Sequence, residues 1–349
     1  MNSIFRDGNL QKLLHRPAAN SFRGVIGTFM GRDALSAALS ILNLGPDDKV
    51  LLPAYLCKEV LRPFLGRARV EFYDVKPDLS VDPEIIKQKF AKSSIKIMLM
   101  INYFGFLQPY RKELKELCTE KGVILIEDCA HSPLTVGSGE TGDIAIYSFR
   151  KILPLPDGGG LRINMPEKAP VLDFYPGYYS NTLSVLILAK LFFNVKAEAF
   201  SRAGITDKKN DVMPAKSSSG KTGRILPIST FARNGVSNAN FPEITEARRR
   251  TFRFWQEALE SNQQAVPVFS DLPPGVCPMG FPVRVQERDL VKSRAQGKGI
   301  HLQIHWILPE AISRDFDNSR ELSLQTMTLP VDPDLGQRER EEVRRLLAA

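Results

Sequence analysis

The chain has 349 residues, with 47 Lys and Arg against 39 Asp and Glu, which gives a formal net charge of +8. Apolar residues make up 43% and charged residues 25%, which is typical of a folded globular protein and excludes disordered and collagen-like classes. At about 150 residues per domain, the length predicts two domains or one large and one small domain.

The positive charge alone could indicate nucleic acid or an anionic substrate. The basic residues are scattered, however, and no RNP, helix-turn-helix or zinc-finger motif is present, so we expect no nucleic-acid partner. No two cysteines form a CxxC pair, which supports neither a disulfide framework nor a zinc site. The first 16 residues lack the apolar stretch of a secretory signal, so we expect a cytoplasmic location.

Apolar strands alternate with amphipathic helices in the first 165 residues. The pattern predicts strands at 50–55, 70–75, 95–102, 123–127 and 144–149. It predicts helices at 32–44, 82–90 and 110–121, with Asp82 as N-cap and Pro83 at the first helical position of the second. Strands that are apolar on both faces and separated by helices indicate an α/β domain with a parallel sheet.

Residues 166–240 follow a different pattern. Residues 182–195 (TLSVLILAKLFFNV) are apolar but shorter than the about 20 residues of a membrane span. We expect a core or subunit-interface helix there, with an interfacial membrane contact as the disfavoured alternative. Residues 206–224 are polar and rich in Lys, Ser and Gly, which indicates a loop, either a solvated linker or a flap over an anionic ligand.

The α/β pattern resumes after this region. It predicts a basic helix at 242–261 containing Arg248, Arg249 and Arg250, a strand at 281–285, a helix at 289–299, a strand or turn at 301–306 and a helix at 337–347. We therefore expect a large domain over residues 1–235, with 166–240 divergent, and a small C-terminal α/β domain over 236–349.

Two groups of polar residues lie beside the predicted strands and helices of the first half. Gly31-Arg32-Asp33 begins a helix, where backbone N–H groups and the helix dipole favour a phosphate, although glycine there is also common punctuation. Glu127 to His131 follow a buried strand, and a carboxylate at that position is costly unless a donor or cation pairs with it. The alternative is that Asp128 caps the next segment and His131 only packs.

A third group, Ser148 to Lys151, follows the next strand and precedes the glycines at 158–160. A deprotonated lysine there could form a Schiff base, although a solvated surface lysine is the commoner case. A phosphate cradle, a carboxylate for a pyridinium nitrogen and a lysine for an aldehyde are together what a pyridoxal 5′-phosphate (PLP) site needs. Because ligands bind at the carboxyl ends of parallel strands, the three groups could share one crevice.

Stretches along most of the chain resemble the DegT/StrS family of sugar aminotransferases, which has the fold of PLP-dependent transferases of fold type I. The matching stretches are GRDALSAAL, LGPDDKVLLPAYLC, YDVKPDLSVD, INYFGFLQP, GVILIEDCAHS, GDIAIYSFRKILPLPDGGGL and MTLPVDPDL. The resemblance implies a large domain with a mostly parallel seven-stranded sheet, a smaller C-terminal α/β domain, PLP as cofactor and a homodimer whose sites are completed by the neighbouring subunit.

The resemblance also implies roles for individual residues. Lys151 would carry the cofactor, Asp128 would hold its pyridinium nitrogen, and His131 would lie against the ring or its 3′-oxygen. The phosphate would be bound by Ser148, Gly31 and Arg32, and the residue near the family's ring-stacking aromatic is Tyr55.

The chain departs from the family pattern at two motifs. SFRK replaces the usual SFHxxK, so Lys151 keeps its distance from the glycines but comes two residues early after Ser148, as in the aspartate aminotransferase branch of the fold. The family's Gly-Thr turn is Gly31-Arg32 here, which replaces a hydroxyl by a cation.

The resemblance predicts an aminotransferase that moves an amino group from glutamate to a keto group. The candidate acceptor is a nucleotide-linked sugar in cell-surface polysaccharide or secondary metabolite biosynthesis, with Lys208, Lys209 and Arg224 as candidate contacts to its diphosphate. Two alternatives stay open: another PLP reaction such as dehydration on the same fold, and a PLP-binding or regulatory protein that has lost turnover.

Two further sets of residues could bind ligands. His301, His305 and Trp306 are candidates for a metal or stacking site, but no carboxylate accompanies the histidines, so we expect no metal. Arg284, in the predicted strand at 281–285, is a candidate carboxylate binder.

Overall fold

The computed structural model describes residues 24–165, 225–308, 312, 315–332 and 336–348. It divides into two compact units, residues 1–44 with 146–239 and residues 45–145 with 240–349. The helix predicted at 182–195 and the loop predicted at 206–224 lie outside the described residues, as do Lys208, Lys209 and Arg224. The domain boundary between residues 235 and 236 stays a prediction.

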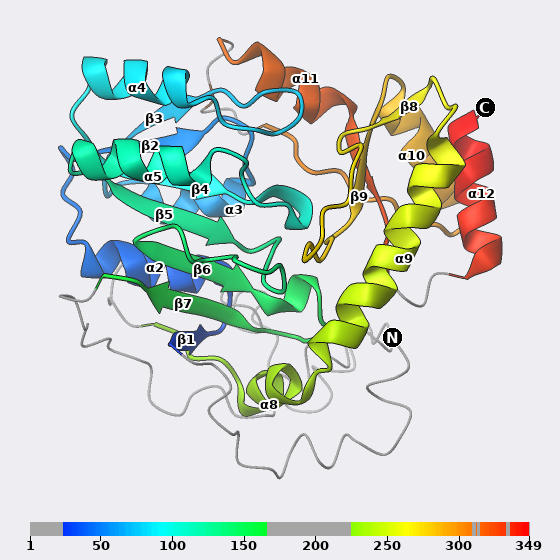
Figure 1. The fold of residues 1–349 in the computed structure, drawn as a ribbon, viewed down its shortest axis with the longest axis horizontal. Helices are drawn as coiled ribbons and strands as arrows, with labels where there is room; N and C mark the ends of the chain where they lie inside the picture. The colour runs from blue at the N-terminus through cyan, green and yellow to red at the C-terminus, as the bar shows by residue number, and fades with distance from the viewer. Residues whose placement is uncertain (1–23, 166–224, 309–311, 313–314, 333–335, 349) are drawn as a thin grey trace, which may run out of the picture. The chain divides into compact units, whose positions relative to one another are not determined.

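Seven strands form one sheet in the order β1-β7-β6-β5-β4-β2-β3. They are β1 (Val25–Thr28), β2 (Lys49–Pro53), β3 (Arg69–Tyr73), β4 (Ile95–Ile101), β5 (Ile124–Cys129), β6 (Ile144–Ser148) and β7 (Gly159–Ile163). β2 pairs in parallel with β3 and β4, β4 pairs in parallel with β5, and β1 runs antiparallel to β7. The predicted α/β fold with a mostly parallel seven-stranded sheet is confirmed (Figure 1).

The first unit contains β1, β6 and β7, helix α2 (Gly31–Ile41), the 3-10 turn η3 (Phe149–Lys151) and helix α8 (Thr230–Asn238). A Cβ on Gly159 would lie 2.3 Å from the backbone oxygen of Met30, so only glycine lets β7 run beneath the start of α2. The buried Asp157 carboxylate accepts hydrogen bonds from the backbone N and Oγ of Ser229, the N-cap of α8. The segment 156–160 therefore packs tightly against its surroundings.

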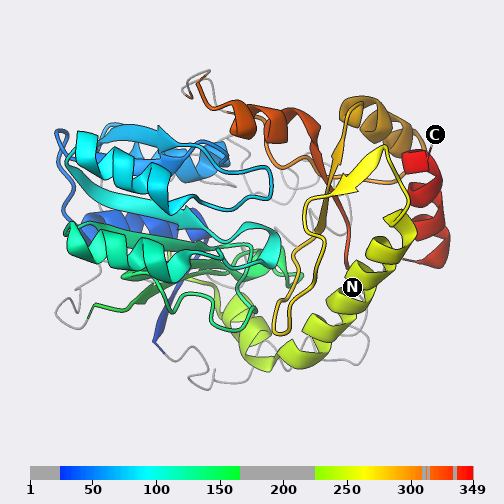
Figure 2. The ribbon, with the colours of Figure 1, turned by 45° about the horizontal axis from the view of Figure 1, so that its top comes forward.

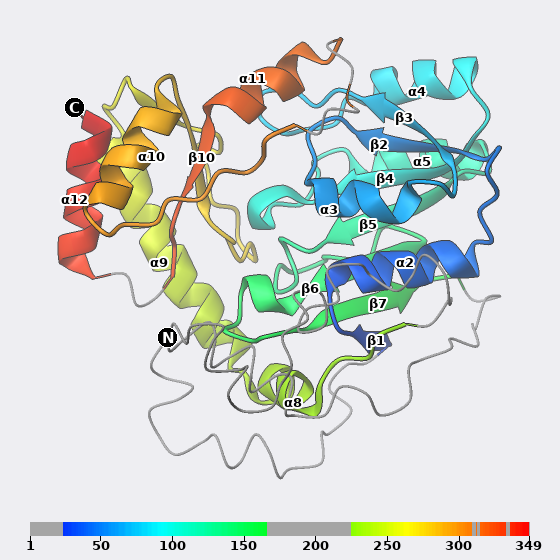
Figure 3. The same ribbon diagram turned by 180° about the vertical axis from the view of Figure 1, so that it is seen from behind.

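The second unit contains β2 to β5 with helices α3 (Lys58–Leu61), α4 (Pro83–Lys92) and α5 (Arg111–Glu120), and the 3-10 turns η1 (Arg62–Phe64) and η2 (Tyr103–Gly105). α4 begins as predicted, because the Asp82 carboxylate accepts a hydrogen bond from the backbone N of Glu84, with Pro83 first in the helix. Figures 1 and 3 show α4 and α5 over one face of these four strands and α3 over the other.

The C-terminal part of this unit is a three-stranded antiparallel sheet of order β10-β9-β8 with helices around it (Figure 2). Its elements are α9 (Phe241–Leu259), β8 (Ala265–Pro267), β9 (Phe281–Val285), α10 (Arg288–Gly297), α11 (Asp317–Gln325), β10 (Thr326–Leu329) and α12 (Gln337–Ala348). The strand at 281–285 and the helices predicted around it are confirmed. The strand option at 301–306 is wrong: only Gln303 forms an isolated bridge, to Thr328.

Two of the three consecutive arginines of α9 bind the protein's own backbone. Arg248 is buried, donates to the carbonyls of Pro278 and Met279, and pairs with Asp332 at 2.7 Å. Arg249 donates to carbonyls between residues 272 and 276. Two of the basic side chains of the chain therefore hold the segment 272–279 in place.

No helix in the described segments is long and apolar enough to cross a membrane.

Candidate active site

The start of α2 approaches the end of β6 closely. A Cβ on Gly31 would lie 3.2 Å from the backbone oxygen of Tyr147 and 3.5 Å from the Cβ of Ser148. A side chain at position 31 would therefore be tight against the Tyr147 carbonyl and in van der Waals contact with Ser148, which is itself buried. The structure brings together two of the three residues predicted to bind a phosphate.

Two arginines of the first unit belong to the segments that meet here, the start of α2 and the turn after β6. Arg32 follows Gly31 in α2, and Arg150 lies in η3 directly after β6. Loss of hydration around its guanidinium and the positive charge of Arg32 lower the pKa of Arg150. An anion near these two side chains would relieve their mutual repulsion. Lys151, the last residue of η3, is exposed, which is also compatible with the solvated lysine of the alternative interpretation.

Asp33, in the first turn of α2, is a buried carboxyl. Its Oδ2 accepts a hydrogen bond from the backbone N of Met30 at 3.0 Å. Burial raises the pKa of Asp33 to about 6, although the charge of Arg32 and the Met30 hydrogen bond oppose the shift. The folded protein therefore favours the protonated form of Asp33 more than an unfolded chain does.

This pKa predicts a pH dependence of stability. The contribution of Asp33 to stability is fully present below its ordinary pKa of 3.8 and is lost as the pH rises through about 6. The loss is on the order of 3 kcal/mol, since each pKa unit corresponds to about 1.4 kcal/mol. Asp33→Asn should flatten the dependence of the melting temperature on pH between 4 and 7, relative to Asp47→Asn at an exposed position. Identical pH profiles for Asp33→Asn and the wild type would contradict it.

The environments of Glu127 and Asp128 differ. Both lie near the end of the buried strand β5, where an ionised carboxylate costs free energy unless a donor or cation pairs with it. Glu127 is fully buried and accepts hydrogen bonds from the amide of Asn102 and from the backbone N of Gly139, Thr141 and Gly142. Asp128, 3% exposed, accepts one from the backbone N of Ala130 at 2.8 Å. The capping contact of the alternative interpretation is therefore present at Asp128.

His131 is buried and its tautomer is defined by a backbone contact. The N–H of Phe104 donates to its Nδ1 at 3.2 Å, so the neutral ring carries its proton on Nε2. The imidazole lies with its centroid 5.2 Å from that of Trp306 and 5.6 Å from that of Phe104. His131 therefore presents a donor at Nε2.

Trp306 connects His131 with Tyr55 inside the second unit. The Tyr55 ring lies 5.3 Å from that of Trp306, its hydroxyl donates to the backbone oxygen of His305, and Tyr103 donates to the backbone oxygen of Tyr55. Burial raises the pKa of Tyr55. Sequence reasoning treated Trp306 as a candidate for stacking but missed this contact, because about 250 residues separate Tyr55 from His305 and no spacing signal spans them.

His305 and Arg284 lie on one face of the small sheet. His305 Nδ1 and Thr328 Oγ1 are 2.8 Å apart, and Arg284 is paired in register with Thr326, two residues before Thr328. The Nε of Arg284 is buried and has no hydrogen-bond partner among the described residues. Within those residues, no group of three or more His, Cys, Asp or Glu side chains is placed to hold a metal ion.

Comparison with known proteins identifies the family of this chain. The model of the DegT/DnrJ/EryC1/StrS aminotransferase family matches residues 20–348. The chain belongs to this family. One curated relative is the dTDP-4-dehydro-2,3,6-trideoxy-D-glucose 4-aminotransferase of Saccharopolyspora spinosa, 32% identical over 146 residues, which are 40% of this chain. The match spans only 38% of that relative's own length.

Solved structures of family members have the same fold. A DegT DnrJ EryC1 StrS aminotransferase from Brucella abortus superposes with a TM-score of 0.66 at 21% identity, covering 93% of this chain and 84% of that one. NtdA from Bacillus subtilis, solved with bound cofactor PMP, superposes with a TM-score of 0.68 at 15% identity, covering 97% and 76%. The fold type implied by the sequence resemblance is confirmed.

Proposed function

We propose that this protein is a PLP-dependent aminotransferase that transfers an amino group from glutamate to a keto group on a nucleotide-linked sugar. The observation that carries the proposal is the packing of Gly31, at the start of α2, against Tyr147 and Ser148 at the end of β6. Membership of the family supports it, and so does the sugar aminotransferase among the relatives. The NtdA structure, with its PMP, supports the choice of cofactor.

The residues of the first unit suit a phosphate group. A helix N-terminus without a side chain at its first residue lets an anion approach the backbone, and the helix dipole favours negative charge there. Ser148 would contribute a hydroxyl and Arg32 a positive charge. Burial and the charge of Arg32 lower the pKa of Arg150, so the two guanidinium groups lie close enough to interact. Both would attract the anion.

The remaining residues would handle protons. When bound, PLP supplies a ring that withdraws electrons from the Cα of an amino substrate. The Asp128 carboxylate would keep the proton on the ring nitrogen, and His131 would donate from Nε2 to the ring's 3′-oxygen. The Nζ of Lys151 would hold the cofactor between turnovers and, once released, carry the proton removed from the substrate Cα.

The test is uptake of PLP and amino transfer by the full chain. Added PLP should give a yellow protein. Glutamate with a nucleotide-linked keto-sugar should then give 2-oxoglutarate and an amino sugar in equal amounts. Loss of water without 2-oxoglutarate would favour the dehydration alternative, and PLP binding without turnover the lapsed regulatory protein. A colourless protein that takes up no PLP would overturn the proposal.

The assembly and cellular location are part of the same proposal. We expect a homodimer, and light scattering after size-exclusion chromatography would measure its mass. We also expect a cytoplasmic enzyme whose partners are its small-molecule substrates. A monomer that turns over substrate at the full rate would contradict the expected completion of each site by a neighbouring subunit. Cell fractionation tests the location.

A further inference from the structure

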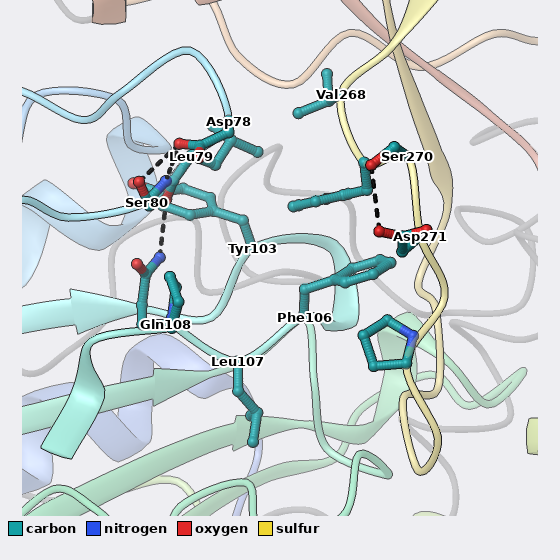
Figure 4. Close-up of a pocket in the computed structure, with 13 residues that line it drawn as sticks. Asp78, Leu79, Ser80, Tyr103, Phe106, Leu107, Gln108, Val268, Ser270 and Asp271 are labelled. Atoms are coloured by element: carbon teal, nitrogen blue, oxygen red, sulfur yellow. Dashed lines mark hydrogen bonds between the residues drawn. The ribbon is translucent and has the colours of Figure 1, made fainter.

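A cavity of about 270 Å³ opens within the second unit, between the loops after β3 and β4 and the segment after β8 (Figure 4). Neither His131 nor Tyr55 lines this cavity. Tyr103 does, and its hydroxyl also donates to the backbone oxygen of Tyr55. Its lining residues are Asp78, Leu79, Ser80, Tyr103, Phe106, Leu107, Gln108, Pro109, Val268, Phe269, Ser270, Asp271 and Pro273.

Aromatic rings form the walls of this cavity. Phe106 and Phe269 stack at 3.9 Å between centroids with an interplanar angle of 14°, and Tyr103 lies on the opposite side of the loop that carries Phe106. Because Phe106 and Phe269 each cover one face of the other and Tyr103 is only 1% exposed, the half-buried Phe269 is the ring left to pack against apolar C–H groups of a ligand. The walls therefore suit a ligand that has an apolar face.

Carboxylates stand at two edges of the cavity. Asp78 accepts hydrogen bonds from the backbone N and Oγ of Ser80 at 3.0 and 2.7 Å, and Asp271 accepts one from Ser270 at 3.5 Å. Neither carboxylate forms an ion pair with any described residue, and the nearby Lys76 pairs with Asp82 at 2.9 Å. No lining residue is basic, although the whole chain has a net charge of +8.

One wall of the cavity is fixed before any ligand binds. Both ends of the Gln108 amide are satisfied, since Oε1 accepts from the backbone N of Val81 and Nε2 donates to the carbonyls of Leu79 and Ile101. These bonds hold the turn that carries Asp78. A ligand there would meet a preformed carboxylate rather than a loop that it must order.

We propose that this cavity binds a monosaccharide-sized amino sugar. The ring would pack on Phe269, its hydroxyls would donate to one carboxylate, and its ammonium group would pair with the other. A cavity of 270 Å³ falls below the ~300–1,000 Å³ of sites for drug-sized ligands, which suits a single sugar ring rather than a nucleotide sugar. The identity of the ligand rests on the proposed function, whose product carries an amino sugar.

Calorimetric titration of the full chain tests the proposal, with D-glucosamine as the probe at a pH where its amine is protonated. We expect a dissociation constant on the order of 1 mM, given the small size of the ligand. D-glucose and N-acetyl-D-glucosamine, which lack the charge, should bind more weakly. The titration is done with and without PLP, so failure to bind the amino sugar is distinguishable from failure to bind the cofactor.

Two variants remove the carboxylates from the edges of the cavity. Asp78→Asn and Asp271→Asn, both at exposed positions, should each weaken glucosamine binding about two- to fivefold, the range of an exposed ion pair. Glu116→Gln, on the exposed surface of α5, removes the same charge elsewhere and should leave the affinity unchanged. No binding of glucosamine, equal binding of glucose, or Asp variants that bind like Glu116→Gln would each overturn the proposal.

Discussion

Replacing Lys151 with alanine should abolish the covalent retention of PLP after borohydride reduction and lower turnover by a factor on the order of 10³ or more. The reason is that only an uncharged amine can bond to the cofactor aldehyde and then accept the substrate's Cα proton. In the wild type, peptide mass spectrometry should find the reduced cofactor on the peptide that contains Lys151.

Lys151→Arg separates the amine from its charge. A guanidinium stays protonated at any working pH, so it preserves the positive charge at position 151 but supplies no nucleophile and no base. We expect Lys151→Arg to bind PLP reversibly, to retain none after borohydride, and to be as inactive as Lys151→Ala. Borohydride-fixed cofactor in Lys151→Ala would assign the attachment to another lysine.

A single 3-10 turn joins the end of β6 at Ser148 to Lys151, which accounts for the short spacing between the two residues. β6 ends at Ser148, and the three residues of η3 make a single tight turn in which the backbone N of both Ile152 and Leu153 donates to the carbonyl of Phe149. Gly159 is fixed beneath the start of α2, so we expect the distance of Lys151 from the glycines, rather than from Ser148, to decide its assignment.

Patterns that arise within one element were predictable from the sequence. The strands that became β4, β5 and β6 are continuous apolar runs, and α4 begins at Asp82 because an N-cap followed by proline is a local signal. The start of α2 at Gly31 was also predictable, because a glycine that begins a helix is a local signal.

Contacts between distant segments could not be predicted in the same way. β7 begins inside a glycine run that has no strand periodicity, and it can lie against the Met30 backbone only because Gly159 has no side chain. The arginines of α9 resemble a solvated basic face in the sequence, but Arg248 is buried against carbonyls 30 residues away. The role of Trp306 likewise depends on partners that lie far along the chain.

The second large effect is expected at Glu127, next to a proposed cofactor ligand but with a different role. Its two oxygens accept four hydrogen bonds at 2.8 to 3.0 Å, three of them from the backbone of the segment 139–142. Gly142 packs so closely that a Cβ there would lie 2.8 Å from the Cβ of Glu127. The carboxylate thus replaces the hydrogen bonds that this buried backbone cannot make to water.

Glu127→Ala should lower the free energy of unfolding by about 3–9 kcal/mol, because three backbone N–H groups lose their acceptor at about 1–3 kcal/mol each. Glu127→Gln keeps the volume but turns an NH₂ group toward two donors that the carboxylate now accepts, so we expect a loss intermediate between wild type and Glu127→Ala. The midpoint of urea unfolding measures both, with the exposed Glu116→Gln expected within about 0.5 kcal/mol of the wild type. If Glu127→Gln were as stable as the wild type, the charge of Glu127 would be irrelevant, and the segment 139–142 would have to be held by its packing on β5 alone.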